Sequence, residues 1–317
     1  MGGVPELAVS GLFSSVYDFL EDTLLPPLGW KVFSEVLQAY QDERDGSRYE
    51  YIDVLPILTC VAAGGDAMRA RPLAAAWVCY ILATRILDDV QDQEGQDQIW
   101  SKEGAEHAMS LGLFAIGVAQ TAVARLPVDS ETQQAIVEAF GKVQALSAAW
   151  QTRRTALEEL TVDRYFQSLT ARTGLIFATG AWAGARIVTP LPEERGLDAL
   201  YQYGLCLGIM GQIVDDCQDL AGVDLPSGTF TLPVIYALSQ REHPEHPRLV
   251  EALNGSDAAP MRVESIASSL SEMKAVEWSL QVAEVYRQRA IAALESLPAD
   301  RIRPLLDYVS TNDYPVT

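Results

Sequence analysis

Apolar residues recur along this chain mainly at the three- and four-residue spacing of a helix, and strict alternation is rare. Ala, Leu, Glu and Gln dominate the segments between breakers, and all four favour helix. The pattern therefore predicts an all-α protein. Helices are expected at residues 6–24, 29–41, 49–63, 71–93, 102–126, 130–157, 162–187, 192–220, 232–239, 259–274 and 278–297.

The breaks between these segments carry few signals of a domain boundary. No Gly/Ser linker or block of charge divides the chain, so a single helical domain over residues 1–317 is expected. Residues 241–260 form the most loop-like stretch, with two His-Pro pairs. Because His243 and His246 have no third ligand nearby, we expect a surface loop there rather than a metal site.

Composition narrows the classes of function. A net charge of −20 argues against nucleic acid as a partner, since a phosphate backbone calls for a basic surface. The four cysteines lack the spacing of metal ligands, and no export or lipid signal is evident, so we expect a cytoplasmic protein. The longest apolar stretch, residues 73–84, is too short to cross a bilayer, so no stable membrane insertion is expected.

One acidic pattern, Asp-Asp-x-Gln-Asp, occurs twice, in LDDVQD and in VDDCQD. We call Asp88, Asp89 and Asp92 the first pentad aspartates, and Asp215, Asp216 and Asp219 the second. On a helix, residues three and four apart share a face, so each set makes an acidic stripe, whose mutual repulsion a bound cation would relieve. A solvated helix end would explain one such stripe, but two after long apolar helices favour a site for cations. Carboxylates suit Mg²⁺, which takes one or two of them and completes its shell with water and phosphates.

The order of segments resembles the trans-isoprenyl diphosphate synthases and the related class I terpene synthases, over residues 64–238. Their two DDxxD motifs correspond to the two pentads. GGDAMRARP resembles their Gly-Gly-Lys-Arg-x-Arg-Pro segment and places Arg69 and Arg71 on its arginines. ARTGLIF resembles their Lys-Thr-x-x-Leu-Phe helix, with Arg172 and Thr173 where a Lys-Thr pair binds diphosphate.

The resemblance implies a large bundle of the isoprenoid synthase type with a central cavity, an allylic prenyl diphosphate as substrate, three Mg²⁺ ions, and a homodimer. It implies that the metal ions are bound by Asp88, Asp89, Asp92, Asp215, Asp216 and Asp219, and that the substrate diphosphate is bound by Arg69, Arg71, Arg172, Thr173 and Gln212. It implies that the catalytic residues are Asp88, Asp92, Asp215 and Arg172. It also implies a substrate pocket that is lined by Trp77, Tyr80, Ala83, Thr84 and Phe177. Ala83 and Thr84 are small, so a long substrate such as farnesyl or geranylgeranyl diphosphate is expected.

Basic residues are missing where chain-elongating members of that family hold isopentenyl diphosphate. QEGQDQIWS follows the first pentad where an Arg-Arg pair would stand, and no basic residue occurs before Lys102. Met68 replaces a lysine of the Gly-Gly-Lys-Arg segment. The sequence therefore favours ionisation of one allylic diphosphate followed by cyclisation or quenching, as in terpene synthases. Two alternatives stay open: a prenyltransferase that adds isopentenyl diphosphate or alkylates another acceptor, and a non-catalytic partner subunit.

Overall fold

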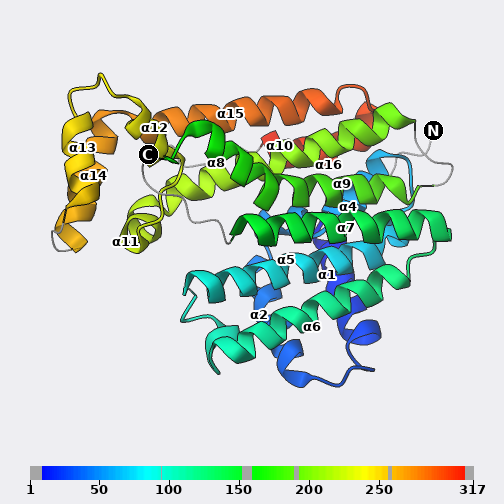
Figure 1. Cartoon of the computed structure of the whole chain (residues 1–317). Helices are drawn as coiled ribbons and strands as arrows, with labels where there is room; N and C mark the ends of the chain where they lie inside the picture. The colour runs from blue at the N-terminus through cyan, green and yellow to red at the C-terminus, as the bar shows by residue number, and fades with distance from the viewer. Residues whose placement is uncertain (1–8, 94, 152–158, 189–192, 256–258, 311–317) are drawn as a thin grey trace. The chain divides into compact units, whose positions relative to one another are not determined.

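The computed structural model of the protein describes residues 9–93, 95–151, 159–188, 193–255 and 259–310 (Figure 1). These described residues form helices joined by turns, with no strand among them, which confirms the all-α prediction. The α-helices are α1 Val9–Phe19, α2 Lys31–Arg44, α3 Tyr49–Asp53, α4 Leu55–Ala62, α5 Arg71–Asp92, α6 Ala105–Ala124, α7 Ser130–Gln151, α8 Val162–Leu169, α9 Leu175–Arg186, α10 Glu194–Gln218, α11 Leu225–Ser227, α12 Leu232–Ser239, α13 His246–Asn254, α14 Ala259–Glu272, α15 Ala275–Leu294 and α16 Ala299–Ser310. Short 3₁₀ turns occupy Ala67–Ala70 and Ile99–Ser101, and π turns occupy Leu20–Leu24, Thr170–Gly174 and Leu220–Asp224.

The chain packs into two compact units. Unit 1 holds residues 1–139, 180–200 and 296–308, and unit 2 holds residues 140–179, 201–295 and 309–317. The first pentad belongs to unit 1 and the second to unit 2. The expectation of a single domain stays a prediction.

Unit 1 is built around α5, whose first two thirds are almost entirely buried. The indole of Trp77 is fully buried and donates from Nε1 to the carbonyl oxygen of Ile52 at 2.7 Å. A Cβ at Gly180 would overlap the Trp77 ring, so a glycine is required for α9 to approach α5 at this point. Among the described residues, α6 is one helix apolar and long enough to cross a membrane; it packs along α5, and 44% of its apolar window is buried.

A buried ion pair joins α2 to α3 in unit 1. Asp53 has no exposed surface and receives the guanidinium of Arg44, the shortest contact being 2.6 Å from Nη2 to Oδ1. The hydroxyl of Tyr17, on α1, donates to the same carboxylate at 2.8 Å. Desolvating two charges is offset only when their hydrogen bonds are satisfied, and here Arg44 donates from Nε to Oδ2 and from Nη2 to Oδ1 of Asp53, a bidentate pairing. The cluster therefore ties three N-terminal helices together.

Unit 2 contains α8, the first part of α9 and most of α10. Gly174 and Gly208 permit close packing between these helices, because a Cβ at Gly208 would press on the ring of Phe177 and one at Gly174 would press on Ile209. Further along, the rings of Tyr236 on α12 and Trp278 on α15 stack with centroids 4.1 Å apart.

Several predicted boundaries change in the structure. The segment predicted as one helix over 162–187 is interrupted by the π turn Thr170–Gly174. The loop predicted at 241–260 is wrong in part, because His246–Asn254 forms α13 and buries Leu249 and Ala252. Helix α16 was not predicted, since Pro304 lies inside it. The end of the predicted helix 130–157 lies outside the described residues beyond 151.

Candidate functional site

The first pentad forms the last turn of α5. Asp88 and Asp92 lie on one face, with Asp88 half-buried and Asp92 exposed. Asp89 points elsewhere, because its Oδ2 accepts a hydrogen bond of 2.9 Å from Nε1 of the buried Trp100. Burial raises the pKa of Asp89, and the hydrogen bond from Trp100 opposes that rise. The three carboxylates are therefore in two different environments.

The second pentad spans the end of α10. Asp215 and Asp216 lie within the helix, whereas Asp219 follows its last residue, Gln218, so the predicted helix 192–220 ends earlier than expected. Asp216 is 7% exposed and accepts hydrogen bonds from Tyr165 Oη at 2.6 Å and from Gln212 Nε2 at 3.0 Å. Burial raises the pKa of Asp216.

The same hydrogen-bond chain reaches a residue predicted to bind diphosphate. The hydroxyl of Thr173, in the π turn after α8, donates to Oε1 of Gln212 at 3.2 Å. Arg172 is exposed, and its positive charge lowers the pKa of Asp216 against the effect of burial. Unit 2 therefore brings together Thr173, Gln212 and Asp216, with the charge of Arg172 close enough to act on the same carboxylate.

Arg69 and Arg71 lie far from the first pentad. Arg71 opens α5 and Asp88 stands near its end, so a rise of 1.5 Å per residue separates their backbones by about 26 Å. Arg69 donates from Nη2 to the carbonyl oxygen of Pro127 at 2.8 Å, and Arg71 stacks on the ring of Phe19. The structure thus does not join these two arginines to the first pentad, because the whole of one continuous helix stands between them.

The pocket predicted around Ala83 is largely a packed core in unit 1. Trp77 and Ala83 are buried, burial raises the pKa of Tyr80 to about 12, and Thr84 is half-buried with its hydroxyl donating to the carbonyl oxygen of Tyr80. Phe177 packs on Gly208 in unit 2.

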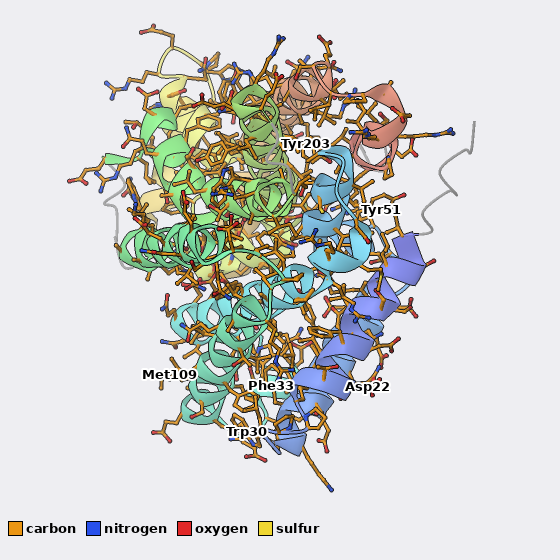
Figure 2. All side chains as sticks on the ribbon, turned by 90° about the vertical axis from the view of Figure 1, so that its right-hand side faces the viewer. Asp22, Trp30, Phe33, Tyr51, Met109 and Tyr203 are labelled. Atoms are coloured by element: carbon orange, nitrogen blue, oxygen red, sulfur yellow. The ribbon has the colours of Figure 1, made fainter. Side chains whose placement is uncertain are left out.

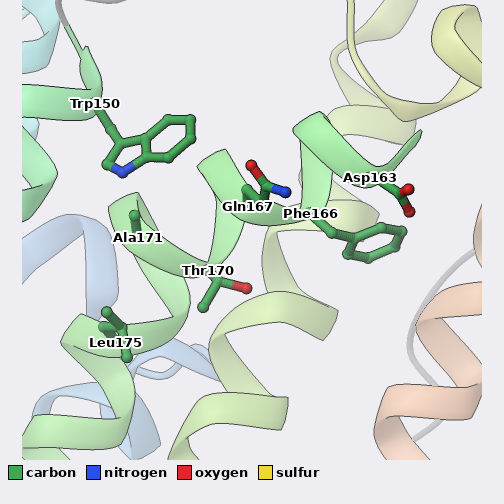
Figure 3. Close-up of a pocket in the computed structure, with 7 residues that line it drawn as sticks. All are labelled: Trp150, Asp163, Phe166, Gln167, Thr170, Ala171 and Leu175. Carbon is green, nitrogen blue, oxygen red and sulfur yellow. The ribbon is translucent and has the colours of Figure 1, made fainter. Parts of the chain in front are cut away.

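An open cavity of about 520 Å³ lies elsewhere in unit 2, beside α8 (Figure 3). Trp150 projects from the end of α7 toward the turn that carries Ala171. None of the predicted pocket residues lines this cavity, whose walls are Trp150, Asp163, Phe166, Gln167, Thr170, Ala171 and Leu175.

The donor chemistry of the pentads fits Mg²⁺. Among the residues that the structure describes, no three His, Cys, Asp or Glu side chains gather as a complete metal cage. Magnesium does not require one, because it usually binds one or two carboxylates together with substrate phosphates and water. Asp88 and Asp92 in unit 1, and Asp215 with Asp219 in unit 2, supply carboxylates of this kind, and Asp89 and Asp216 also accept hydrogen bonds from aromatic donors.

Comparison with known proteins identifies the family. The model of the polyprenyl synthetase family matches residues 53–270, a range that includes both pentads. The chain belongs to the polyprenyl synthetase family. The predicted family is thereby confirmed, and membership supports the prediction of an enzyme class that acts on allylic diphosphates.

Individual relatives are distant. Heptaprenyl diphosphate synthase component 2 of Bacillus subtilis is 26% identical over 235 residues, which cover 70% of this chain but only 64% of that relative. Geranylgeranyl diphosphate synthase of Saccharolobus solfataricus is 26% identical over 258 residues, 74% of this chain and 76% of the relative. The solved geranylgeranyl pyrophosphate synthetase from Pyrococcus horikoshii aligns with a TM-score of 0.78 at 21% identity, over 96% of this chain and 97% of that one. This likeness confirms the fold.

Sequence reasoning missed Trp100 and Tyr165. Both donate to the second aspartate of a pentad. A signal was available, because an aspartate beside apolar helix positions needs a donor when it is buried, and Trp and Tyr are the aromatic residues that carry one.

Proposed function

We propose that the protein is a Mg²⁺-dependent prenyltransferase that ionises an allylic prenyl diphosphate and transfers the prenyl group to an acceptor, with isopentenyl diphosphate as the first acceptor to test. The observation that carries the proposal is the family match over residues 53–270, which contains both acidic pentads and the segment with Arg172 and Thr173. The named relatives are synthases of prenyl diphosphates. This favours transfer over cyclisation.

Each site residue has a role that its chemistry supports. Asp88, Asp92 and Asp215 would hold Mg²⁺, and the bound ions would neutralise the departing diphosphate. Thr173 and Gln212 would orient that diphosphate, while the exposed guanidinium of Arg172 would pair with its oxygens. The ionisation itself moves no proton, so the residues act in it by charge and position. Addition of the allylic cation to the double bond of isopentenyl diphosphate would then form the new C–C bond, and the adduct would lose one proton, which the released diphosphate can accept.

The expectation of terpene cyclisation is not supported by the comparisons. It rested on the missing basic residues after the first pentad, and that departure is real, because residues 93–101 contain none. Arg69 and Arg71 do not replace them at the pentad, since α5 separates them from it. A direct assay is therefore needed to show whether isopentenyl diphosphate is the acceptor.

One assay tests the proposal and its competitors. The protein is incubated with Mg²⁺ and geranyl, farnesyl or geranylgeranyl diphosphate, with and without isopentenyl diphosphate, and both released diphosphate and organic products are measured. Longer prenyl diphosphates that form only with isopentenyl diphosphate support the proposal. Hydrocarbons or terpene alcohols formed without it would replace transfer by cyclisation or quenching, and no turnover of any substrate would indicate a partner subunit.

The state of assembly belongs to the proposal as well. Family resemblance favours a homodimer, while the name of the Bacillus subtilis relative, component 2, points to a possible second kind of subunit. We propose the homodimer as the active form. If the isolated chain is inactive, the same assay repeated with candidate partner subunits distinguishes a two-component enzyme from a silent chain.

A further inference from the structure

Two parts of the segment that follows the first pentad, Gly95 and Trp100, lie against Asp89. Gln93 ends α5 with a left-handed backbone, at φ 58°, and Gly95 is also left-handed, at φ 62°. The 3₁₀ turn Ile99–Ser101 then places Trp100, which is 1% exposed, with Nε1 2.9 Å from Asp89 Oδ2. The segment without basic residues thus ends in an aromatic donor bonded to the pentad.

Gly95 closes on the same carboxylate. A Cβ at this position would overlap Oδ2 of Asp89, and the positive φ also disfavours any other residue. The backbone at Gly95 and the indole of Trp100 therefore both lie against Oδ2 of Asp89. Such a close approach leaves Asp89 little freedom to rotate.

The indole of Trp100 is itself held in place. The guanidinium carbon of Arg85 lies 5.2 Å from the Trp100 ring centroid, and Arg85 Nη1 donates to both carboxylate oxygens of Glu43, at 2.9 and 3.0 Å. Arg85 precedes Asp89 by four residues, so both side chains leave the same part of α5. The ring is consequently fixed by a cation that a second helix, α2, anchors in turn.

We propose that Trp100 is a positioning residue for the first pentad: its N–H, with Gly95 closing over the same oxygen, fixes Asp89 apart from Asp88 and Asp92 and so preserves one geometry for the metal ligands. This rests on the proposed function only in taking Mg²⁺ and diphosphate as the ligands. Three neighbouring carboxylates could otherwise adopt several arrangements around a cation. Groups that orient ligands without touching the metal commonly govern its affinity.

The test measures binding without turnover. Calorimetry with Mg²⁺ and inorganic pyrophosphate is applied to the full-length protein and to Trp100→Phe, which keeps a ring but removes the donor. We expect pyrophosphate to bind about tenfold more weakly, the size of one hydrogen bond to a charged group. Asp89→Asn keeps an oxygen that can accept from Trp100, so it should weaken binding by less than Asp92→Asn does. Asp92→Asn should lose binding.

Two further variants separate positioning from general damage. Gly95→Ala disturbs the same carboxylate from the backbone and should weaken Mg²⁺-pyrophosphate binding like Trp100→Phe. Trp30→Phe is the control of the same chemistry, because Trp30 packs edge-to-face against Phe114, with ring centroids 4.9 Å apart, and should leave binding unchanged. Adding Trp100→Phe to Asp89→Asn should weaken binding less than Trp100→Phe does alone, which a merely structural role would not produce.

Unchanged pyrophosphate binding by Trp100→Phe would overturn the proposal, as would a loss in Asp89→Asn as large as that in Asp92→Asn. The outcome is distinguishable from failure of the proposed function. If the variants change Mg²⁺-pyrophosphate binding in this pattern but the protein turns over no prenyl diphosphate, the positioning role of Trp100 stands and the proposed prenyltransferase activity is wrong. A wild-type protein that does not bind Mg²⁺-pyrophosphate overturns both.

Discussion

The hydroxyl of Tyr165 donates a 2.6 Å hydrogen bond to Asp216, a carboxylate that is nearly buried in unit 2. Trp100 makes the equivalent contact with Asp89 in unit 1. In each pentad, therefore, the second of the paired aspartates accepts from an aromatic N–H or O–H. Each of these donors therefore holds one of the aspartates that the family resemblance counts among the metal ligands.

Tyr165→Phe should destabilise the protein by about 1 to 3 kcal/mol, because a buried carboxylate loses a donor. The bond from Tyr165 lowers the pKa of Asp216 while burial raises it, so the variant raises that pKa further. A carboxyl group with a raised pKa in the folded state costs stability only once it ionises. The destabilisation should therefore be small in acid and grow as the pH rises above the unfolded value of about 3.9. Urea unfolding of both proteins across pH checks this, and a loss that shrinks with rising pH would contradict it.

Asp88→Asn combined with Asp92→Asn should abolish release of diphosphate while leaving helicity unchanged. Asp88 is half-buried and Asp92 is exposed, and asparagine keeps the size of each side chain, so the helix should be retained. Diphosphate release and circular dichroism measure the two effects. Asp97→Asn, an exposed aspartate five residues after Asp92, is the control and should keep full activity. Retained turnover in the double variant would remove the metal-site assignment.

Thr84→Phe should shorten the longest prenyl chain that the enzyme accepts. Thr84 is half-buried and stands one turn before the first pentad, whereas its neighbour Ala83 is 2% exposed and would be overpacked by the same change. Substrate profiles with C10, C15 and C20 allylic diphosphates measure the effect. Thr121→Phe on α6 is a matched control, because Thr121 is also half-buried and its hydroxyl bonds to the carbonyl oxygen four residues earlier. An unchanged substrate profile in Thr84→Phe would show that Thr84 does not limit the length of the bound prenyl chain.

The sequence predicted the helices and the acidic stripes because both follow from local spacing. A buried aspartate implies some donor, but the sequence does not say which of the six aspartates face inward, because the donors of Asp89 and Asp216 are positioned by a turn and by packing between helices. The distance of Arg69 and Arg71 from the first pentad could not be predicted either, and their role in binding diphosphate stays a prediction. Similarity to a sequence motif does not give the spatial distance between its residues. Only the structure shows that the continuous helix α5 separates the two arginines from the first pentad.

Asp53→Asn should destabilise the protein by about 3 to 5 kcal/mol, because the buried Arg44 guanidinium loses its carboxylate. Thermal or urea unfolding measures the change. Glu159→Gln offers a control, since its partner Arg164 is 38% exposed and such surface pairs contribute about 0 to 1 kcal/mol. A similar small effect in Asp53→Asn would mean that the buried pair does not stabilise the junction of α1, α2 and α3.

Leu113→Glu should weaken the proposed homodimer. Leu113 is 66% exposed on α6, and Met109, one turn earlier and 42% exposed, lies on the outer side of that helix in Figure 2. Two large apolar side chains on one edge of a helix favour a protein contact, and a charge in place of one of them should oppose it. Light scattering coupled to size exclusion measures the mass. Val285→Glu, on the exposed surface of α15, is the control and should keep the wild-type mass. If both variants stay dimeric, the contact lies on another surface; a monomeric wild type would instead remove the dimer from the proposal.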